Sequence, residues 1–370
     1  MLSDGVPTPP CIARISYLDN DRNDRQIIHD DEMNCFMSRI LYVSVYGGVG
    51  TPPDSKKRLR SAKKGFTMKN LLIYNAYAAK GASPQSMETI VHTLERTGIS
   101  IEAVRTEYAG HAIELTEQAA REGAERVIIT GGDGSINEAF NGLVNAQKAG
   151  LEAPALLIVP NGRGNDYVTG TGLPKKPEDI AAALKADHRK LVDVGYAGDG
   201  TFERCFANGS GFGIDSAINY YASQTVIKNK LSYAYGLIKS IFCDLVQQEA
   251  HFEIDGDSFD ETFVVFTAMN GLMEGGGFKI GSGFDLSDGL LNLCLIGKGL
   301  PAGRLIKRIP DIINGKLDHP DIWTRKAARV HVHLDSGKHG LFSQVDGETI
   351  IVNGYDFYAG ISPYKVTLIA

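Results

Sequence analysis

The feature that most constrains the fold is the alternation of short apolar runs with amphipathic stretches between residues 68 and 160. Four runs are typical of strands, and the stretches between them place apolar side chains at helical spacing. The run at residues 126–130 is apolar after its first residue, so helices are expected on both faces of the sheet. This order predicts a doubly wound, parallel α/β sheet, in which ligands bind at the carboxyl ends of the strands. The predicted strands are Leu71 to Tyr74, Ile101 to Val104, Arg126 to Thr130 and Ala155 to Val159.

Beyond about residue 196 the pattern changes. Asp199-Gly200 and Asp255-Gly256 lie between apolar runs and are typical of hairpin turns. We therefore expect an α/β domain at residues 68–196 and a mainly antiparallel, β-sandwich-like domain at residues 197–370. A return of the last strands to the first domain stays open. Strands are expected at 252–254, 263–269, 290–296 and 330–334, and helices near 228–245 and 304–313.

The first 67 residues differ from the rest of the chain. They contain several prolines, a polar stretch at 19–32 and a basic run at 56–64, which follows the short apolar piece at 40–46. A secretory signal has the opposite order, so we interpret residues 1–67 as a flexible extension. A translation start at Met68 is the alternative. The basic run is either a solvated linker or a contact with an anionic membrane surface.

Composition excludes several classes of protein. The 370 residues carry a net charge of −6 and are 43% hydrophobic, which argues against a disordered chain and against nucleic-acid binding through a positive field. The five cysteines are widely spaced with no CxxC pair, as expected for reduced thiols in a cytoplasm. No apolar run reaches the ~18 residues of a bilayer span. We expect a cytoplasmic protein without a nucleic-acid partner.

The sharpest motif is Gly131-Gly132-Asp133-Gly134-Ser135, between a buried strand and a helix. Consecutive glycines let the backbone approach a polyphosphate, and the helix N-terminus favours its negative charge. Asp133 is placed to hold a Mg²⁺ between phosphates. The motif predicts a phosphoryl-transfer site without a Walker lysine. The alternative is a tight turn in which Ser135 caps the helix.

A second loop, at residues 160–167, follows the next strand and so opens on the same edge of the sheet. Its two glycines, Arg163 and Asp166 would suit the ribose and phosphates of a nucleotide, although a loop ending in an Asn or Asp cap explains them too. Asn137 and Glu138, in the first turn of the preceding helix, fit either site residues or complements of the helix dipole.

Six motifs together resemble the diacylglycerol kinase catalytic-domain family. That family includes bacterial diacylglycerol kinases, related bacterial lipid kinases and eukaryotic sphingosine kinases, and belongs with the NAD kinases in one superfamily. The resemblance covers roughly residues 68–370, and it implies an ATP-binding, nucleotide-binding kinase domain at residues 68–196 and a lipid-substrate domain at residues 197–370. In chain order the motifs are GGDGSINEAFNGL (131–143), PNGRGNDY (160–167), VDVG (192–195), NGSG (208–211), SDGLL (287–291) and VDGE (345–348).

The resemblance implies a role for each matching residue. Asp133, Asp166 and Asp193 match acidic residues around a catalytic Mg²⁺ and water, and Glu348 matches the general base. A structural Mg²⁺ falls on Asp288, with Asp285 and Leu290 contributing main-chain oxygens. The residues that match ATP contacts are Thr106, Gly131, Gly132, Asp133, Gly134, Ser135, Ile136 and Asn137.

The chain departs from the family pattern at three positions within these motifs. Ser135 stands where threonine is usual, Arg163 replaces a threonine that contacts the nucleotide, and Ser287 replaces a common aspartate. The first change retains the hydroxyl, and the arginine could pair with a phosphate instead. These differences indicate a divergent member.

We interpret the sequence as an ATP-dependent lipid kinase that transfers the γ-phosphate of MgATP to a lipid primary hydroxyl, with diacylglycerol to phosphatidate as the leading reaction. The expected partner is a membrane lipid at a peripheral membrane surface, and the oligomeric state, a homodimer included, stays open. Two alternatives remain. One is a soluble-metabolite kinase of the NAD kinase or phosphofructokinase type, and the other is a catalytically inactive lipid-binding module. Asp346-Gly347 before Glu348 is also a hairpin signal, and turn and catalytic site can coexist.

Overall fold

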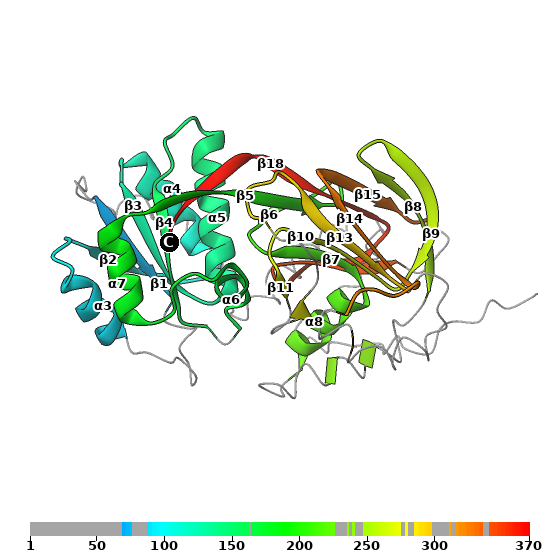
Figure 1. The fold of residues 1–370 in the computed structure, drawn as a ribbon, viewed down its shortest axis with the longest axis horizontal. Coiled ribbons are helices and arrows are strands. Elements are labelled where there is room, and N and C mark those ends of the chain that lie inside the picture. Colours follow the sequence, from blue (N-terminus) through cyan, green and yellow to red (C-terminus); the bar gives the residue numbers. More distant parts are fainter. Residues whose placement is uncertain are drawn as a thin grey trace, which may run out of the picture. The chain divides into compact units, whose positions relative to one another are not determined.

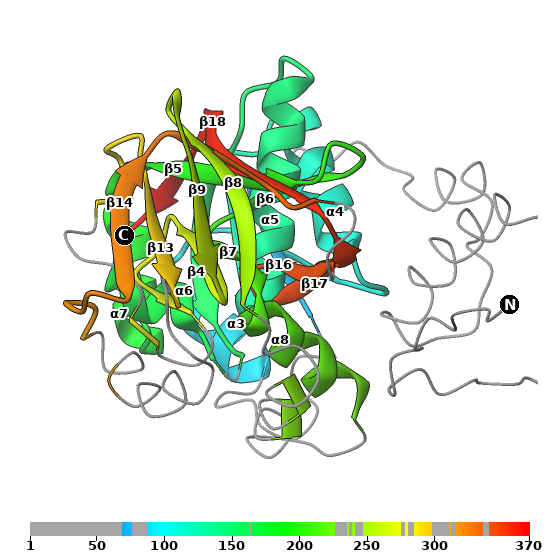
Figure 2. The same ribbon diagram turned by 90° about the vertical axis from the view of Figure 1, so that its right-hand side faces the viewer.

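A computed structural model gives the fold (Figures 1 and 2). The chain divides into a unit of residues 1–63 and a unit of residues 64–370, and every residue described below belongs to the second. The predictions for residues 1–67 and for Arg163 lie outside the described residues, as do most of those for the helices near 228–245 and 304–313. The structure describes residues 69–75, 87–162, 164–225, 235–236, 239–240, 247–274, 278–279, 285–297, 311, 316–335 and 340–370.

The first part of the fold is a parallel sheet in the order β2-β1-β3-β4. Its neighbouring strands are in register, with Leu71 opposite Val127 and Val127 opposite Leu156. The strands are β1 (Asn70–Tyr74), β2 (Glu102–Arg105), β3 (Arg126–Gly131) and β4 (Ala155–Pro160), and the helices are α3 (Met87–Glu95), α4 (His111–Arg121), α5 (Asp133–Lys148), α6 (Asp166–Thr171) and α7 (Pro177–Ala186).

Helices cover both faces of this sheet (Figure 1). Phe140 and Leu143 of α5 pack with Ile129 in one apolar cluster, whereas Leu94 of α3 and Leu184 of α7 belong to a second cluster on the other face. The central strands are therefore apolar on both sides, as burial between two helical layers requires. The predicted doubly wound α/β architecture is confirmed.

The second part is mainly antiparallel. A six-stranded sheet has the order β14-β13-β10-β7-β16-β17. It packs against the strands that continue the first sheet beyond β4, in the order β18-β15-β8-β9. At this contact Phe212 is stacked on Phe357 at a centroid distance of 5.4 Å. The predicted β-sandwich-like domain is confirmed. Its strands are β5 (Arg189–Gly198), β6 (Glu203–Phe206), β7 (Gly209–Gly213), β8 (Gln248–Ile254), β9 (Asp257–Phe263), β10 (Val265–Met269), β11 (Met273–Glu274), β12 (Phe278–Lys279), β13 (Leu291–Ile296), β14 (Ile322–Ala327), β15 (Arg329–His333), β16 (Leu341–Val345), β17 (Glu348–Gly354) and β18 (Asp356–Ile369).

Two details differ from the sequence-based expectation. The apolar run at 263–269, predicted as one strand, contains the end of β9 and all of β10, because the chain passes from one sheet to the other at Val264. The helix α8 (Ile214–Gln224), which sequence reasoning missed, follows β7 and contacts β16 and β17 (Figure 2). In the part of the chain that the structure describes, no helix is both long and apolar enough for a bilayer span.

The last strand connects the two parts of the fold. β18 pairs antiparallel with β15 and β5, and Leu368 near its end pairs with Leu156 of the parallel strand β4. Figure 1 shows β18 running beside β5. Residue 196, the predicted domain boundary, lies inside β5.

The predicted hairpins at Asp199-Gly200 and Asp255-Gly256 are confirmed. Asp199-Gly200 lies in the longer turn between β5 and β6, where Gly200 but not Asp199 has a positive φ, of 89°. Asp255-Gly256 and Asp346-Gly347 form tight turns. Asp255 and Gly256, between β8 and β9, have φ values of 50° and 95°, and Asp346 and Gly347, between β16 and β17, have 46° and 84°. Both residues of each tight turn are thus in the left-handed region that tight hairpins demand and that Asp and Gly tolerate.

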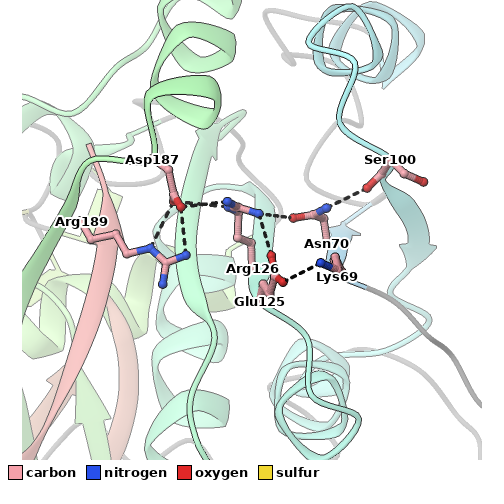
Figure 3. A network of polar contacts seen from close by, with 7 residues as sticks. All are labelled: Lys69, Asn70, Ser100, Glu125, Arg126, Asp187 and Arg189. Carbon is pink, nitrogen blue, oxygen red and sulfur yellow. Dashed lines mark hydrogen bonds and ion pairs between the residues drawn. The ribbon is translucent and has the colours of Figure 1, made fainter.

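A polar network joins the amino ends of β1 and β3 to the turn after α7 (Figure 3). The Arg126 guanidinium donates to both carboxylate oxygens of Asp187, at 3.3 and 2.8 Å, and to Asn70 Oδ1 at 3.0 Å. These hydrogen bonds hold the pKa of Asp187 below its usual range. Because the network is at the amino ends of the strands, it stabilises the edge of the sheet opposite the glycine loops.

Candidate active site

Two glycine loops meet at the carboxyl ends of β3 and β4. The Asn161 N–H donates to the Gly131 carbonyl at 2.7 Å, and a Cβ on Gly162 would lie only 2.3 Å from Gly132 Cα. A Cβ on Gly131 would lie 2.3 Å from Ser135 Oγ. The glycines are therefore required by close approach of the backbone. The two loops predicted to share one edge of the sheet are in contact.

Asp133 and Asp166 start the two helices that leave these loops. Asp133 Oδ1 accepts a hydrogen bond from the Tyr167 N–H at 3.1 Å. A Cβ on Gly164 would lie 3.1 Å from Asp133 Oδ2 and 3.8 Å from Asp166 Oδ1, so both carboxylates face the same stretch of backbone. Two carboxylates form the hard oxygen donor set that Mg²⁺ prefers, and they fit the expected catalytic ion.

Three other predicted ATP contacts, Ser135, Ile136 and Thr106, are buried within the protein. Ser135 is the third residue of α5, whose N-cap is Gly132, so Ser135 is not the helix cap. Ile136 is a buried member of the α/β core, and Thr106 is buried just after β2, its N–H donating to Tyr74. Glu138 accepts the N–H groups of residues 110 and 112 at the start of α4, and burial raises its pKa.

Glu348 reaches this region from β17. Its Oε1 lies 3.2 Å from the position of a Cβ on Gly134, and its Oε2 lies 2.7 Å from Arg204 Nη1. The Glu348 side chain is 32% exposed and that of Arg204 13%. A carboxylate from the far end of the chain is thus held over the first glycine loop.

A second carboxylate of the same hairpin has a different environment. Asp346 Oδ2 accepts from Asn137 Nδ2 at 2.8 Å and from the Ala207 N–H at 2.9 Å, and its Oδ1 accepts the N–H groups of Asn208 and Gly209, each at 2.9 Å. Withdrawal from water raises the pKa of Asp346. These contacts attach the hairpin to α5 and to the corner between β6 and β7. Sequence reasoning interpreted Asp346 only as a turn residue.

Asp193 lies in β5 with its carboxylate buried. One oxygen pairs with Lys365 Nζ at 2.7 Å, and the other accepts the Gly289 N–H at 2.7 Å. The Asp193 N–H in turn donates to the Leu286 carbonyl. These contacts anchor the turn at residues 285–290 to the core, a role that the motif did not indicate.

The side chains of Asp288 and Asp285, which the resemblance implies as part of a structural Mg²⁺ site, have partners within the chain. Asp288 Oδ2 is paired with Lys326 Nζ at 2.7 Å, and its Oδ1 accepts the Leu290 N–H at 3.1 Å. The Asp285 carboxylate accepts the N–H and hydroxyl of Ser287, which lower its pKa. A lysine ammonium thus already neutralises Asp288. Among the described residues, no three His, Cys, Asp or Glu side chains are grouped so that they could hold a metal.

Two family models match the chain in sequence. The model described as "Diacylglycerol kinase catalytic domain" matches residues 69–197, and the "YegS C-terminal NAD kinase beta sandwich-like domain" matches residues 210–370. The chain thus carries the catalytic domain of the diacylglycerol kinase family, followed by a YegS-type C-terminal domain. Kinases of this family transfer phosphate to a hydroxyl group, and ATP is their phosphate donor.

Curated relatives agree with this family, and a solved structure shares the fold. "Probable lipid kinase YegS-like" of Citrobacter koseri is 28% identical over 300 residues, which are 80% of this chain and 93% of the relative. "Probable lipid kinase YegS" of Salmonella typhimurium is 27% identical with the same coverage. A diacylglycerol kinase structure from Bacillus anthracis shares the fold, with a TM-score of 0.61, 22% identity and coverage of 81% and 96% of the two chains. The predicted family and fold are confirmed.

Proposed function

We propose that this protein is an ATP-dependent lipid kinase that phosphorylates the primary hydroxyl of diacylglycerol to give phosphatidate. The observation that carries the proposal is the Glu348 carboxylate held over Gly134 of the first glycine loop. A proton acceptor and a backbone suited to polyphosphate are thereby combined at one place, which supports transfer of a phosphoryl group to an alcohol.

The chemistry divides among a few groups. The glycine loops and the start of α5 offer backbone N–H groups to the phosphates of ATP. The hydroxyl oxygen of the acceptor attacks the γ-phosphorus, the bond to the ADP oxygen breaks, and Glu348 Oε1 takes the hydroxyl proton and later returns it to solvent. Asp133 and Asp166 would hold a Mg²⁺, which supplies positive charge against the transferred phosphoryl group.

A lipid acceptor is supported by the relatives, which are described as probable lipid kinases, and by aromatic side chains beside the Glu348 hairpin. Tyr220 of α8 stacks on Phe342 of β16 at 4.9 Å, and Tyr221 lies 4.2 Å from Lys239 Nζ. Half-buried aromatic rings with a nearby cation suit an amphipathic molecule that has acyl chains and a polar head. We extend the proposal to a peripheral position at the membrane surface, where such a substrate is found.

The test is transfer of labelled γ-phosphate from ATP with Mg²⁺ into defined acceptors in mixed micelles: diacylglycerol, ceramide, sphingosine and monoacylglycerol, and NAD and fructose 6-phosphate in solution. We expect labelled phosphatidate with the wild type and a fall of about 10²–10⁴-fold in Glu348→Gln. The matched control is Glu253→Gln, an exposed glutamate of β8, which should retain the wild-type rate.

Each other result has a defined meaning. Labelling of another lipid would retain the lipid kinase and replace the substrate. Labelling of NAD or the sugar phosphate alone would replace the function by that of a soluble kinase. Lipid binding without any transfer, in the presence of ATP and Mg²⁺, would refute catalysis.

A further inference from the structure

The two oxygens of the Glu348 carboxylate have different surroundings. Oε2 is held by the Arg204 guanidinium at 2.7 Å, whereas Oε1 is the oxygen that lies next to Gly134. Arg204 belongs to β6, and its side chain is only 13% exposed. The guanidinium therefore determines which carboxylate oxygen faces the glycine loop.

Arg204 is itself held by Asn137 of α5, just after the first glycine loop. Asn137 Oδ1 accepts from Arg204 Nε at 2.9 Å, and the two hydrogens of Asn137 Nδ2 serve Asp346 Oδ2 at 2.8 Å and the Cys205 carbonyl at 2.9 Å. Asn137 is 1% exposed. Because its amide donors are committed within the protein, a nucleotide contact would break one of these hydrogen bonds.

The charges around Arg204 also favour its position beside Glu348. Burial raises the pKa of Glu138 of α5, the charge of Glu348 raises it further and the charge of Arg204 lowers it, so the three groups interact. The guanidinium thus lies close to the carboxylate of Glu348 and within the electrostatic range of that of Glu138. Without this cation, repulsion between these two carboxylates would drive the half-buried Glu348 side chain toward solvent.

We propose that Arg204 is the positioning residue for Glu348, and that Asn137 aligns Arg204 and makes no contact with the nucleotide. The proposal deepens the proposed function and rests on it, because it takes Glu348 as the proton acceptor. α5 is thus connected to the proton acceptor through two contacts, one between Asn137 and Arg204 and one between Arg204 and Glu348.

The kinetic test compares Arg204→Ala, Arg204→Lys and Asn137→Ala in the full-length protein, with ATP and lipid varied separately. We expect kcat to fall about 10²-fold in Arg204→Ala, as for a reacting group displaced by about 1 Å, with the KM for ATP unchanged. Arg204→Lys should retain part of the rate. Millimolar guanidinium, but not tetramethylammonium, should partly restore Arg204→Ala.

The matched control is Arg325→Ala. Arg325 is also paired with a carboxylate, that of Asp257 at 2.7 Å, but this pair joins β14 and β9. Arg325→Ala should retain the wild-type rate and gain nothing from guanidinium. A raised KM for ATP with unchanged kcat in Asn137→Ala would make Asn137 a nucleotide ligand and overturn that half of the proposal. A wild-type rate in Arg204→Ala, unchanged by added guanidinium, would overturn the other half of the proposal, the positioning of Glu348 by Arg204.

A second measurement separates this proposal from the proposed function. Urea unfolding of Arg204→Ala, Glu348→Ala and the double variant requires no lipid substrate. We expect the double variant to be destabilised by less than the sum of the single variants, because the pair is already broken in each. Additive losses would refute the contact even if the protein is a lipid kinase. Coupled losses in a protein that phosphorylates no lipid would retain the contact and reject the proposed function.

Discussion

Replacement of Asp346 by alanine should destabilise the protein far more than replacement of an ordinary hairpin aspartate. The change removes the acceptor of three backbone N–H groups, those of the buried residues 207–209, and of one Asn137 hydrogen. A buried donor left without a partner costs about 1–3 kcal/mol. Partial entry of water reduces the sum, so we expect a loss of about 3–5 kcal/mol in unfolding free energy, plus about 1 kcal/mol for alanine at a φ of 46°.

The matched control is Asp255→Ala. Asp255 has a φ of 50° and accepts the N–H groups of Ala328 and Arg329, but all three residues are exposed and water can replace the lost acceptor. Its loss should be about 1–2 kcal/mol. Asp346→Asn should fall between the two alanine variants, because one oxygen remains for two of the donors while its amide hydrogens oppose the others.

The assay is urea denaturation at pH 7, followed by circular dichroism and by tyrosine fluorescence to test for a single transition. The expected order of midpoints is wild type, Asp255→Ala, Asp346→Asn and Asp346→Ala, from highest to lowest. Equal midpoints for the two alanine variants would refute the reasoning, since they would mean that the hydrogen bonds at Asp346 contribute no more than those of an exposed turn.

Three further predictions concern other parts of the fold. Burial raises the pKa of Asp215 from 3.8 to about 6, so the folded state binds this proton more tightly than the unfolded state. The protonated carboxyl therefore stabilises the fold below pH ~4, and this stabilisation is lost as the pH rises through ~6. Urea titrations at pH 4 and 7 should show that Asp215→Asn removes about 2–3 kcal/mol of the decline in unfolding free energy between these two pH values. Lys326→Met should leave Asp288 without its cation, so Mg²⁺ should raise the melting temperature of this variant by more than that of the wild type; an equal response of both would contradict the reasoning. Burial raises the pKa values of Cys205 and Cys294 to about 11 and 12, and mass spectrometry after treatment with a thiol reagent at pH 8 should find both unmodified until urea unfolds the chain.

The sequence predicted the parallel part of the fold and the meeting of the glycine loops for a physical reason. Periodicity is a local property, and once β3 and β4 are parallel neighbours, the loops after them must leave the same edge of the sheet. The hairpins followed equally locally, because Asp-Gly is favoured wherever two successive residues need positive φ. Residues 263–269 were harder, since a continuous apolar run contains no sign that the chain changes sheets at Val264.

The partners of the site residues were not accessible to the same reasoning. Arg204 belongs to no motif, and its ion pair with Glu348 forms only because β6 and β17 bring the two side chains together. Asp346 gives the same local signal as Asp255, although the first is enclosed by backbone donors and the second is in water. The lysine that pairs with Asp193 is Lys365, near the end of the chain, and only the pairing of β5 with β18 determines that contact. In each case the information lies in long-range contacts.

The pairing of β18 with β4 has a consequence for synthesis of the protein. During translation the amino-terminal half leaves the ribosome first. Strand β4, which carries one of the glycine loops, then lacks its neighbour β18 until Leu368 can pair with Leu156. Formation of such a long-range contact is slow because a large loop must close first. The edge of β4 is exposed during that time, so the nascent α/β part depends for its completion on a strand that is synthesised long after it.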